Sequence, residues 1–206
     1  MNNKKTYSLV ITALFAAIII LMAFVPYLGY LNLVLIKATI IHVPVIIGSI
    51  ILGPKKGALL GFIFGLTSLI NNTFNPSLLS FAFSPFYNGG NALSLVICFV
   101  PRILVGVVPY FVFEGMNRLL RKLDGKSLIS LPVAAVAGSL TNTLLVMPMI
   151  YLFFRAQFAA AKGIPVNAVL GVVNGIIAAN GIPEAFVAAV IVTVVSMALI
   201  KLGYRR

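Results

Sequence analysis

Long apolar stretches, most of them bounded by basic or turn-forming residues, run through this whole chain. Hydrophobic residues make up 61% of it, charged residues only 9%, and the mean hydropathy is +1.13. A chain of this composition cannot surround its core with a water-facing surface, so we place it in a lipid bilayer. Its 206 residues give room for about five to seven helices of ~20 residues each. We therefore predict an all-α integral membrane protein with a single membrane domain, residues 1–206.

Six transmembrane spans fit the pattern best. Turn-forming residues at 26–29 and 53–57, and a polar loop at 72–90, separate the first four of them. Two prolines, Pro101 and Pro109, interrupt the fourth. The predicted spans are residues 7–25, 38–52, 58–71, 91–116, 128–154 and 183–202.

The basic residues predict the orientation of these spans. With the N-terminus in the cytoplasm, 11 basic residues lie inside and three outside, while Arg102 lies within a span. The inside set is Lys4, Lys5, Lys55, Lys56, Arg118, Arg121, Lys122, Lys126, Lys201, Arg205 and Arg206, and the outside set is Lys37, Arg155 and Lys162. Both termini are therefore expected in the cytoplasm, which requires an even number of spans. The net charge of +12 then reflects topology and anionic headgroups, and we expect no nucleic-acid partner.

Residues 166–179 do not fit this scheme easily. The stretch is apolar but only 14 residues long, and Gly171 and Gly175 interrupt it. A seventh span here would put the basic C-terminus outside. We therefore assign the stretch to a long outer loop, re-entrant or packed over a cavity.

Arg102 is the charge that most needs an explanation. It lies 11 residues from Asn91, a depth of ~16 Å at about 1.5 Å per residue. A cation at such a depth costs at least ~2.5–3.5 kcal/mol and is tolerated mainly beside a polar cavity or a partner. Arg102 is therefore a candidate ligand-binding residue. The alternative is a structural arginine that donates to helix-end carbonyls or pairs with an internal acid.

Further candidates lie in and just before the last two predicted spans, and Asn142 is at a depth similar to that of Arg102. Thr141 and Asn142 belong to the run Ser139–Thr143, where four of five residues are polar. Glu184 is the acid nearest the outer half, with Asn180 four residues before it. All four are candidate ligand contacts. The competing explanations are hydrogen bonds between helices for the first pair, and ordinary helix-start chemistry at Pro183 for Glu184.

The sequence argues against an intramembrane enzyme. One histidine, one cysteine and three acids give neither a nucleophile–base pair nor a metal-binding set within the spans. His42 is more typical of a packed residue, and Cys98 has no partner for an intrachain disulfide. No phosphate-binding G-x-x-x-x-G-K-[ST] motif is present. We predict no enzymatic activity, no cofactor and no metal site.

The first span carries a small-x-x-x-small pair, Ala13 and Ala17. Small residues four apart on one helix face allow close helix contact, so this pair is a candidate docking face in the membrane. The alternative is that it packs against another helix of the same chain.

Together these features resemble the substrate-binding S-components of bacterial energy-coupling-factor (ECF) vitamin transporters. The resemblance covers the whole chain and rests on Ala13 and Ala17, on the segment Ile51–Ala58, and on Gly61 and Gly65 beyond it. It implies a multi-pass protein of the bacterial cell membrane that binds a vitamin in its outer half. It also implies docking through the first-span alanines onto a membrane scaffold subunit coupled to two ATPases, with transport by toppling of the whole S-component.

Within the family, four short patterns look most like pantothenate-type members: Ala38–Gly48, Val100–Gly106, Gly138–Thr143 and Ile182–Ala185. The resemblance thus implies pantothenate as ligand, with Arg102 on its carboxylate and Asn142 and Glu184 on its amide and hydroxyls. Tyr87 is a further candidate contact, because an aromatic vitamin would need stacking rings such as Tyr27, Tyr30, Phe86 and Tyr87. Riboflavin, folate, pyridoxine or cobalamin remains an alternative ligand, and a ligand-free membrane scaffold protein is the alternative function.

Overall fold

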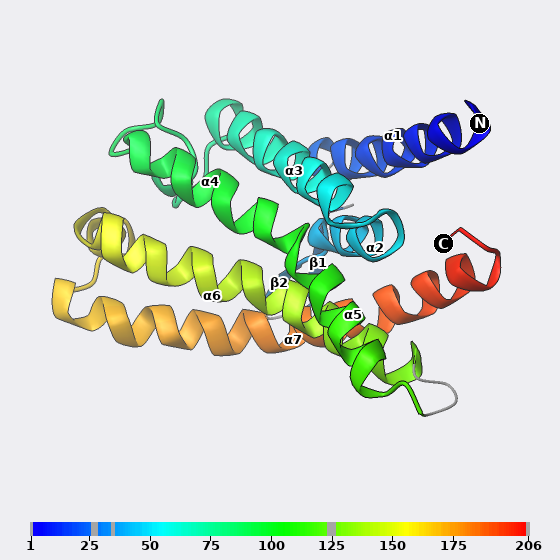
Figure 1. The fold of residues 1–206 in the computed structure, drawn as a ribbon. Coiled ribbons are helices and arrows are strands. Elements are labelled where there is room, and N and C mark those ends of the chain that lie inside the picture. Colours follow the sequence, from blue (N-terminus) through cyan, green and yellow to red (C-terminus); the bar gives the residue numbers. More distant parts are fainter. Residues whose placement is uncertain (1, 26–28, 34–35, 123–126, 205–206) are drawn as a thin grey trace.

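A computed structural model describes residues 2–25, 29–33, 36–122 and 127–204. Most of its helices run roughly along the length of the molecule (Figure 1). Within the described residues, five segments are long and apolar enough to cross a membrane: Lys5–Phe24, Pro54–Phe74, Ala92–Leu119, Ser127–Lys162 and Val166–Lys201. The prediction of a helical multi-pass membrane protein agrees with this architecture.

The helices are α1 (Asn2–Phe24), α2 (His42–Leu52), α3 (Pro54–Phe74), α4 (Ala92–Val105), α5 (Val108–Leu119), α6 (Ser127–Lys162) and α7 (Val169–Lys201). Two short 3₁₀ turns, η1 (Ser80–Ala82) and η2 (Val166–Ala168), lie in the connections. The all-α prediction missed one element, the antiparallel hairpin of β1 (Tyr30–Leu33) and β2 (Ile36–Thr39). Its alternating apolar residues lie in a segment that we had assigned mainly to an outer loop.

The predicted second span is only partly helical. Residues 38 and 39 belong to β2, and α2 has 11 residues, ten of them buried. Its length of about 16 Å is roughly half of the hydrocarbon core of a bilayer. A six-span count therefore stays a prediction.

The predicted fourth span consists of two helices, α4 and α5, separated at Gly106 and Val107. Pro109 lies in the first turn of α5. Because proline has no backbone N–H, it cannot donate to the carbonyl of Val105, and a continuous helix would lose that bond. The break follows from the proline that the sequence analysis had noted.

The assignment of residues 166–179 to an outer loop is wrong. They form η2 and the first third of α7, which is continuous to Lys201. Val169 and Val173, four residues apart, are buried in a cluster with side chains of α6, and this packing outweighs the low helix propensity of the glycines. A Cβ atom at Gly171 or Gly175 would meet nothing within 4 Å, so these glycines do not mark a turn.

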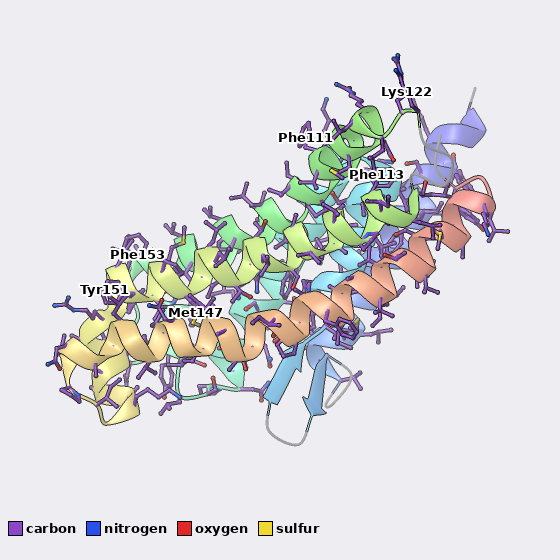
Figure 2. All side chains as sticks on the ribbon, turned by 90° about the horizontal axis from the view of Figure 1, so that it is seen from below. Phe111, Phe113, Lys122, Met147, Tyr151 and Phe153 are labelled. Carbon is purple, nitrogen blue, oxygen red and sulfur yellow. The ribbon has the colours of Figure 1, made fainter. Side chains whose placement is uncertain are left out.

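Both ends of the chain lie at the same end of the molecule (Figure 1). The rings of Tyr7 and Tyr204 stack with their centroids 5.7 Å apart, and the Lys56 ammonium group donates to the Ser8 hydroxyl. Lys122 lies toward this end, whereas Tyr151 and Phe153 lie toward the other (Figure 2). The side of the membrane that this basic end faces stays a prediction, and Lys126, Arg205 and Arg206 lie outside the described residues.

Three glycines bring α3 and α4 into backbone contact. A Cβ atom at Gly57 would lie 1.9 Å from the Gly106 carbonyl oxygen, one at Gly61 would lie 2.2 Å from the Arg102 oxygen, and one at Gly65 would lie 3.0 Å from the Cys98 oxygen. The glycines recur every four residues on α3, and their partners recur every four residues in the opposite direction along the chain. Small residues permit this close approach. They fix the depth of Arg102 relative to α3.

We predict that Gly61→Ala destabilises the protein by about 1–3 kcal/mol, because the added methyl group overlaps the backbone of α4 and neither helix can yield locally. Thermal unfolding of the purified protein in detergent measures the effect. Gly171→Ala is the matched control: it adds the same methyl group to an exposed position with no neighbour within 4 Å. Equal melting temperatures for the two variants would contradict the proposed contact.

Candidate ligand-binding site

A cavity of about 420 Å³ lies between α3, α4, α6 and α7. The ends of α1 and β2 and the segment that joins α3 to α4 complete its wall. Its polar lining consists of Thr39, Thr67, Ser68, Asn71, Asn72, Ser77, Arg102, Asn142, Thr143, Lys162, Asn180 and Glu184. This volume lies within the range of small-molecule sites, about 300–1,000 Å³.

Arg102 is held in the cavity wall by the helix that carries it. Its side chain is 6% exposed, and its Nη1 atom donates to the Ile97 carbonyl oxygen at 2.6 Å. In an uninterrupted helix that carbonyl would accept from the N–H four residues on, which is the position of Pro101. Because Pro101 has no backbone N–H, the Ile97 carbonyl oxygen remains available to accept from the guanidinium. Arg102 thus makes the structural hydrogen bond to a helix carbonyl that the sequence suggested as an alternative role, and it also lines the cavity.

Two aromatic rings also contact the guanidinium of Arg102. Its Cζ atom lies 4.7 Å from the ring centre of Phe83 and 5.6 Å from that of Phe64. Both rings line the cavity. Phe64 belongs to α3, and Phe83 follows η1 in the α3–α4 connection. A cation beside aromatic faces is stabilised without the loss of its N–H donors.

Asn142 lines the cavity, and its neighbour Thr141 does not. The Thr141 hydroxyl donates to the Ala137 carbonyl within α6, and Thr143 is the threonine of this helix that lines the cavity. The buried Oδ1 atom of Asn142 has no hydrogen-bond partner among the described residues. A buried acceptor of this kind usually has a partner, and in a cavity wall a ligand N–H or O–H would supply one.

Glu184 connects α7 to the hairpin. Its side chain is 7% exposed, and its Oε1 atom accepts the backbone N–H of Thr39 at 2.8 Å. Figure 2 shows the hairpin projecting from the helices beside α7. The carboxylate thus fixes the end of β2 at the edge of the cavity, in addition to lining it. This long-range contact was not foreseen from the sequence.

The remaining predicted contacts divide between the cavity and other places. Asn180 lines it, one helical turn before Glu184. Tyr87 is absent from the lining and packs against the apolar cluster of Val169 and Val173, which also contains Phe81 and Phe154. Phe86 is 78% exposed. Tyr27, which was considered for ring stacking, lies outside the described residues, as does the side chain of Tyr30.

The contribution of α3 to the cavity was not predicted from the sequence. Thr67, Ser68, Asn71 and Asn72 all line the cavity. Their spacing places them on one face of the C-terminal half of α3, and this pattern is a signal that could have been used. Lys162, at the end of α6, also lines the cavity. From the sequence it was used only to predict the orientation of the spans.

The candidate docking pair lies on the surface of the bundle. Ala13 and Ala17 are both exposed on α1, and they are flanked by exposed apolar residues such as Leu9, Leu14 and Leu21. The same helix buries Phe15 and Ile19 in the core. The pair does not serve as an internal packing face among the described residues, which was the alternative considered.

Chemically, the cavity offers cationic donors, neutral hydroxyl and amide groups, one carboxylate, and apolar patches. It suits a small, hydrophilic molecule with an anionic group and several hydrogen-bonding groups. A helical membrane protein with such a cavity is typical of a solute-binding transport component.

Comparison with known proteins supports this class. Residues 7–196 match the family model described as "ECF transporter, substrate-specific component". The chain is 38% identical over 207 residues to the "Pantothenic acid transporter PanT" of Lactococcus lactis subsp. cremoris, covering 98% of this chain and 97% of that protein. It is 34% identical over 210 residues to the "Pantothenate transporter PanT" of Leuconostoc mesenteroides, covering 100% and 98%. The chain belongs to the family of ECF transporter substrate-specific components.

We predict that Glu184→Ala releases the end of β2. Losing a hydrogen bond to a charged acceptor costs about 1.5–3 kcal/mol, so amide exchange at Thr39 should accelerate about tenfold or more. Hydrogen–deuterium exchange of the peptide that contains Thr39 measures this. Glu184→Gln keeps an acceptor oxygen at the same position and should remain close to the wild type. Unchanged exchange in Glu184→Ala would show that other contacts hold the hairpin.

Proposed function

We propose that this protein is the pantothenate-binding subunit of an ECF importer in a bacterial cell membrane. The observation that carries the proposal is the placement of Arg102, a buried cation in the wall of a polar cavity between membrane helices. Both relatives described above are named as transporters of this compound. The proposal is therefore supported independently by chemistry and by similarity.

The ligand groups match the lining. Pantothenate carries one carboxylate, one amide and two hydroxyl groups. Arg102 binds the carboxylate, and Asn142 accepts a hydrogen bond from the amide or a hydroxyl through its unpaired oxygen. Glu184, Asn180 and Thr143 bind the remaining hydroxyls.

A flat aromatic vitamin fits this lining less well. Such a ligand needs rings on which to stack, and Phe86 and Tyr87 do not line the cavity. Phe64 and Phe83 do line it, but their rings lie against Arg102. A ligand-free scaffold function does not account for a cavity with a buried, unsatisfied acceptor. Pantothenate is the ligand that the lining favours.

The rest of the proposal concerns membrane placement and partners. The single domain, residues 1–206, crosses the membrane with six spans, with α2 and the hairpin forming the short second one. The basic end faces the cytoplasm. The exposed alanines of α1 dock onto a membrane scaffold subunit, and two partner ATPases drive a toppling motion that delivers the ligand.

We predict that Arg102→Ala weakens pantothenate binding at least about thirtyfold, because truncating one partner of a buried charge pair costs about 2 kcal/mol or more. Isothermal titration of the purified protein measures the affinity. Arg155→Ala is the control: it removes an exposed cation that contacts Tyr151 outside the cavity, and it should bind normally. Normal binding by Arg102→Ala would contradict the assignment of the carboxylate.

We predict that the double substitution Ala13→Leu and Ala17→Leu abolishes pantothenate uptake by cells and leaves binding by the isolated protein intact. Larger side chains on α1 prevent close contact with another helix, and both positions are exposed and outside the cavity. Uptake of labelled pantothenate, measured with the partner subunits present, tests this. Ala198→Leu, at an exposed position of α7, should transport normally. Full uptake by the double variant would exclude this docking face.

A further inference from the structure

The segment between α3 and α4 is firmly attached to α3. The Ser80 hydroxyl donates to the Asn72 side-chain oxygen at 2.8 Å, and the hydroxyls of Ser84 and Thr73 lie 2.7 Å apart. Both serines are fully buried. The start of α4 is tied to the same segment, because the Ser94 hydroxyl donates to the Phe81 carbonyl oxygen at 2.7 Å.

Phe83 lies between these two anchored serines. Its backbone N–H bonds to the Ser80 carbonyl, as does that of Ser84. Its ring lies 4.7 Å from the Arg102 guanidinium carbon, the nearer of the two rings there. The position of this ring is thus set by α3 and η1, while the position of Arg102 is set by α4.

A guanidinium binds a carboxylate through N–H groups in its own plane. The Cζ atom of Arg102 lies over the Phe83 ring, and this contact limits the movement of the guanidinium. The bond from Nη1 to the Ile97 carbonyl fixes one edge. Together the ring and the carbonyl restrain the position of the guanidinium in the cavity wall.

We propose that Phe83 is a positioning residue that orients Arg102 for the ligand carboxylate, and that it thereby sets the preference of the site for carboxylates over neutral analogues. The inference rests on the proposed function and adds to it a determinant of specificity. Phe83 acts through Arg102, so its contribution appears only when the ligand carries the anion.

The test compares pantothenate with panthenol, in which the carboxylate is replaced by a primary alcohol. Titrations of the purified full chain give both affinities. Phe83→Leu should weaken pantothenate binding about tenfold more than panthenol binding, in line with a desolvated cation–aromatic contact. In an Arg102→Ala background the same substitution should no longer affect pantothenate more than panthenol.

Phe86→Leu is the matched control, because it makes the same change three residues away at a position that is 78% exposed and outside the lining. It should bind both ligands as the wild type does. If Phe83→Leu does not fold, Phe83→Met keeps the side-chain volume without the ring and takes its place.

Equal losses for pantothenate and panthenol would overturn the inference, since Phe83 would then be only part of the wall. Unchanged affinity for both would overturn it as well. A wild-type protein that binds no pantothenate would overturn the proposed function itself. If the wild type binds pantothenate and Phe83→Leu keeps the same preference for pantothenate over panthenol, this inference is overturned and the proposed function stands.

Discussion

The backbone contact between α3 and α4 is the constraint on which the site depends. Gly57, Gly61 and Gly65 let the two helices approach closely. A methyl group added at any of these positions would collide with backbone or side-chain atoms of the opposite helix or of Gly106 at its end. In a bilayer there is little hydrophobic drive between helices, so close packing carries much of the association. The contact places Arg102 beside the polar face of α3. Cavity and helix packing are therefore parts of one arrangement.

A buried cation in a membrane needs several partial compensations. Here they come from different sources: a helix carbonyl that Pro101 leaves without its usual donor, and the faces of Phe64 and Phe83. None of these neutralises the charge. They stabilise the guanidinium in place while its positive charge remains effective toward an anion, which is what a binding site requires.

Much of the site could be predicted from residue type and depth. Arg102, Asn142, Asn180 and Glu184 stood out as polar groups within apolar runs, and the structure brings all four to one cavity. Thr143 lines the cavity and Thr141 does not, because side-chain direction on α6 cannot be read from depth alone. Tyr87 was chosen for its chemistry, and only the folding of the connection after η1 turns it elsewhere.

The fold was predictable where apolar runs were long and clearly bounded. The errors lie where tertiary packing overrides a local signal: Val169 and Val173 make a helix of a glycine-interrupted stretch, and cross-strand pairing makes a hairpin of a loop. Sequence periodicity does not contain the partner against which such segments pack. The bond between Thr39 and Glu184 spans 145 residues and has no local signature at all.

The position of Pro101 beside Arg102 has a consequence for how this protein tolerates mutation. Any other residue at 101 would restore a backbone N–H that competes with the guanidinium for the Ile97 carbonyl. Gly61 constrains the same arginine from the opposite helix. Pro101 and Gly61, which carry no reactive or charged group, thus determine how Arg102 is held in the site. A saturation scan of this chain should find them as intolerant as the polar residues that face the cavity.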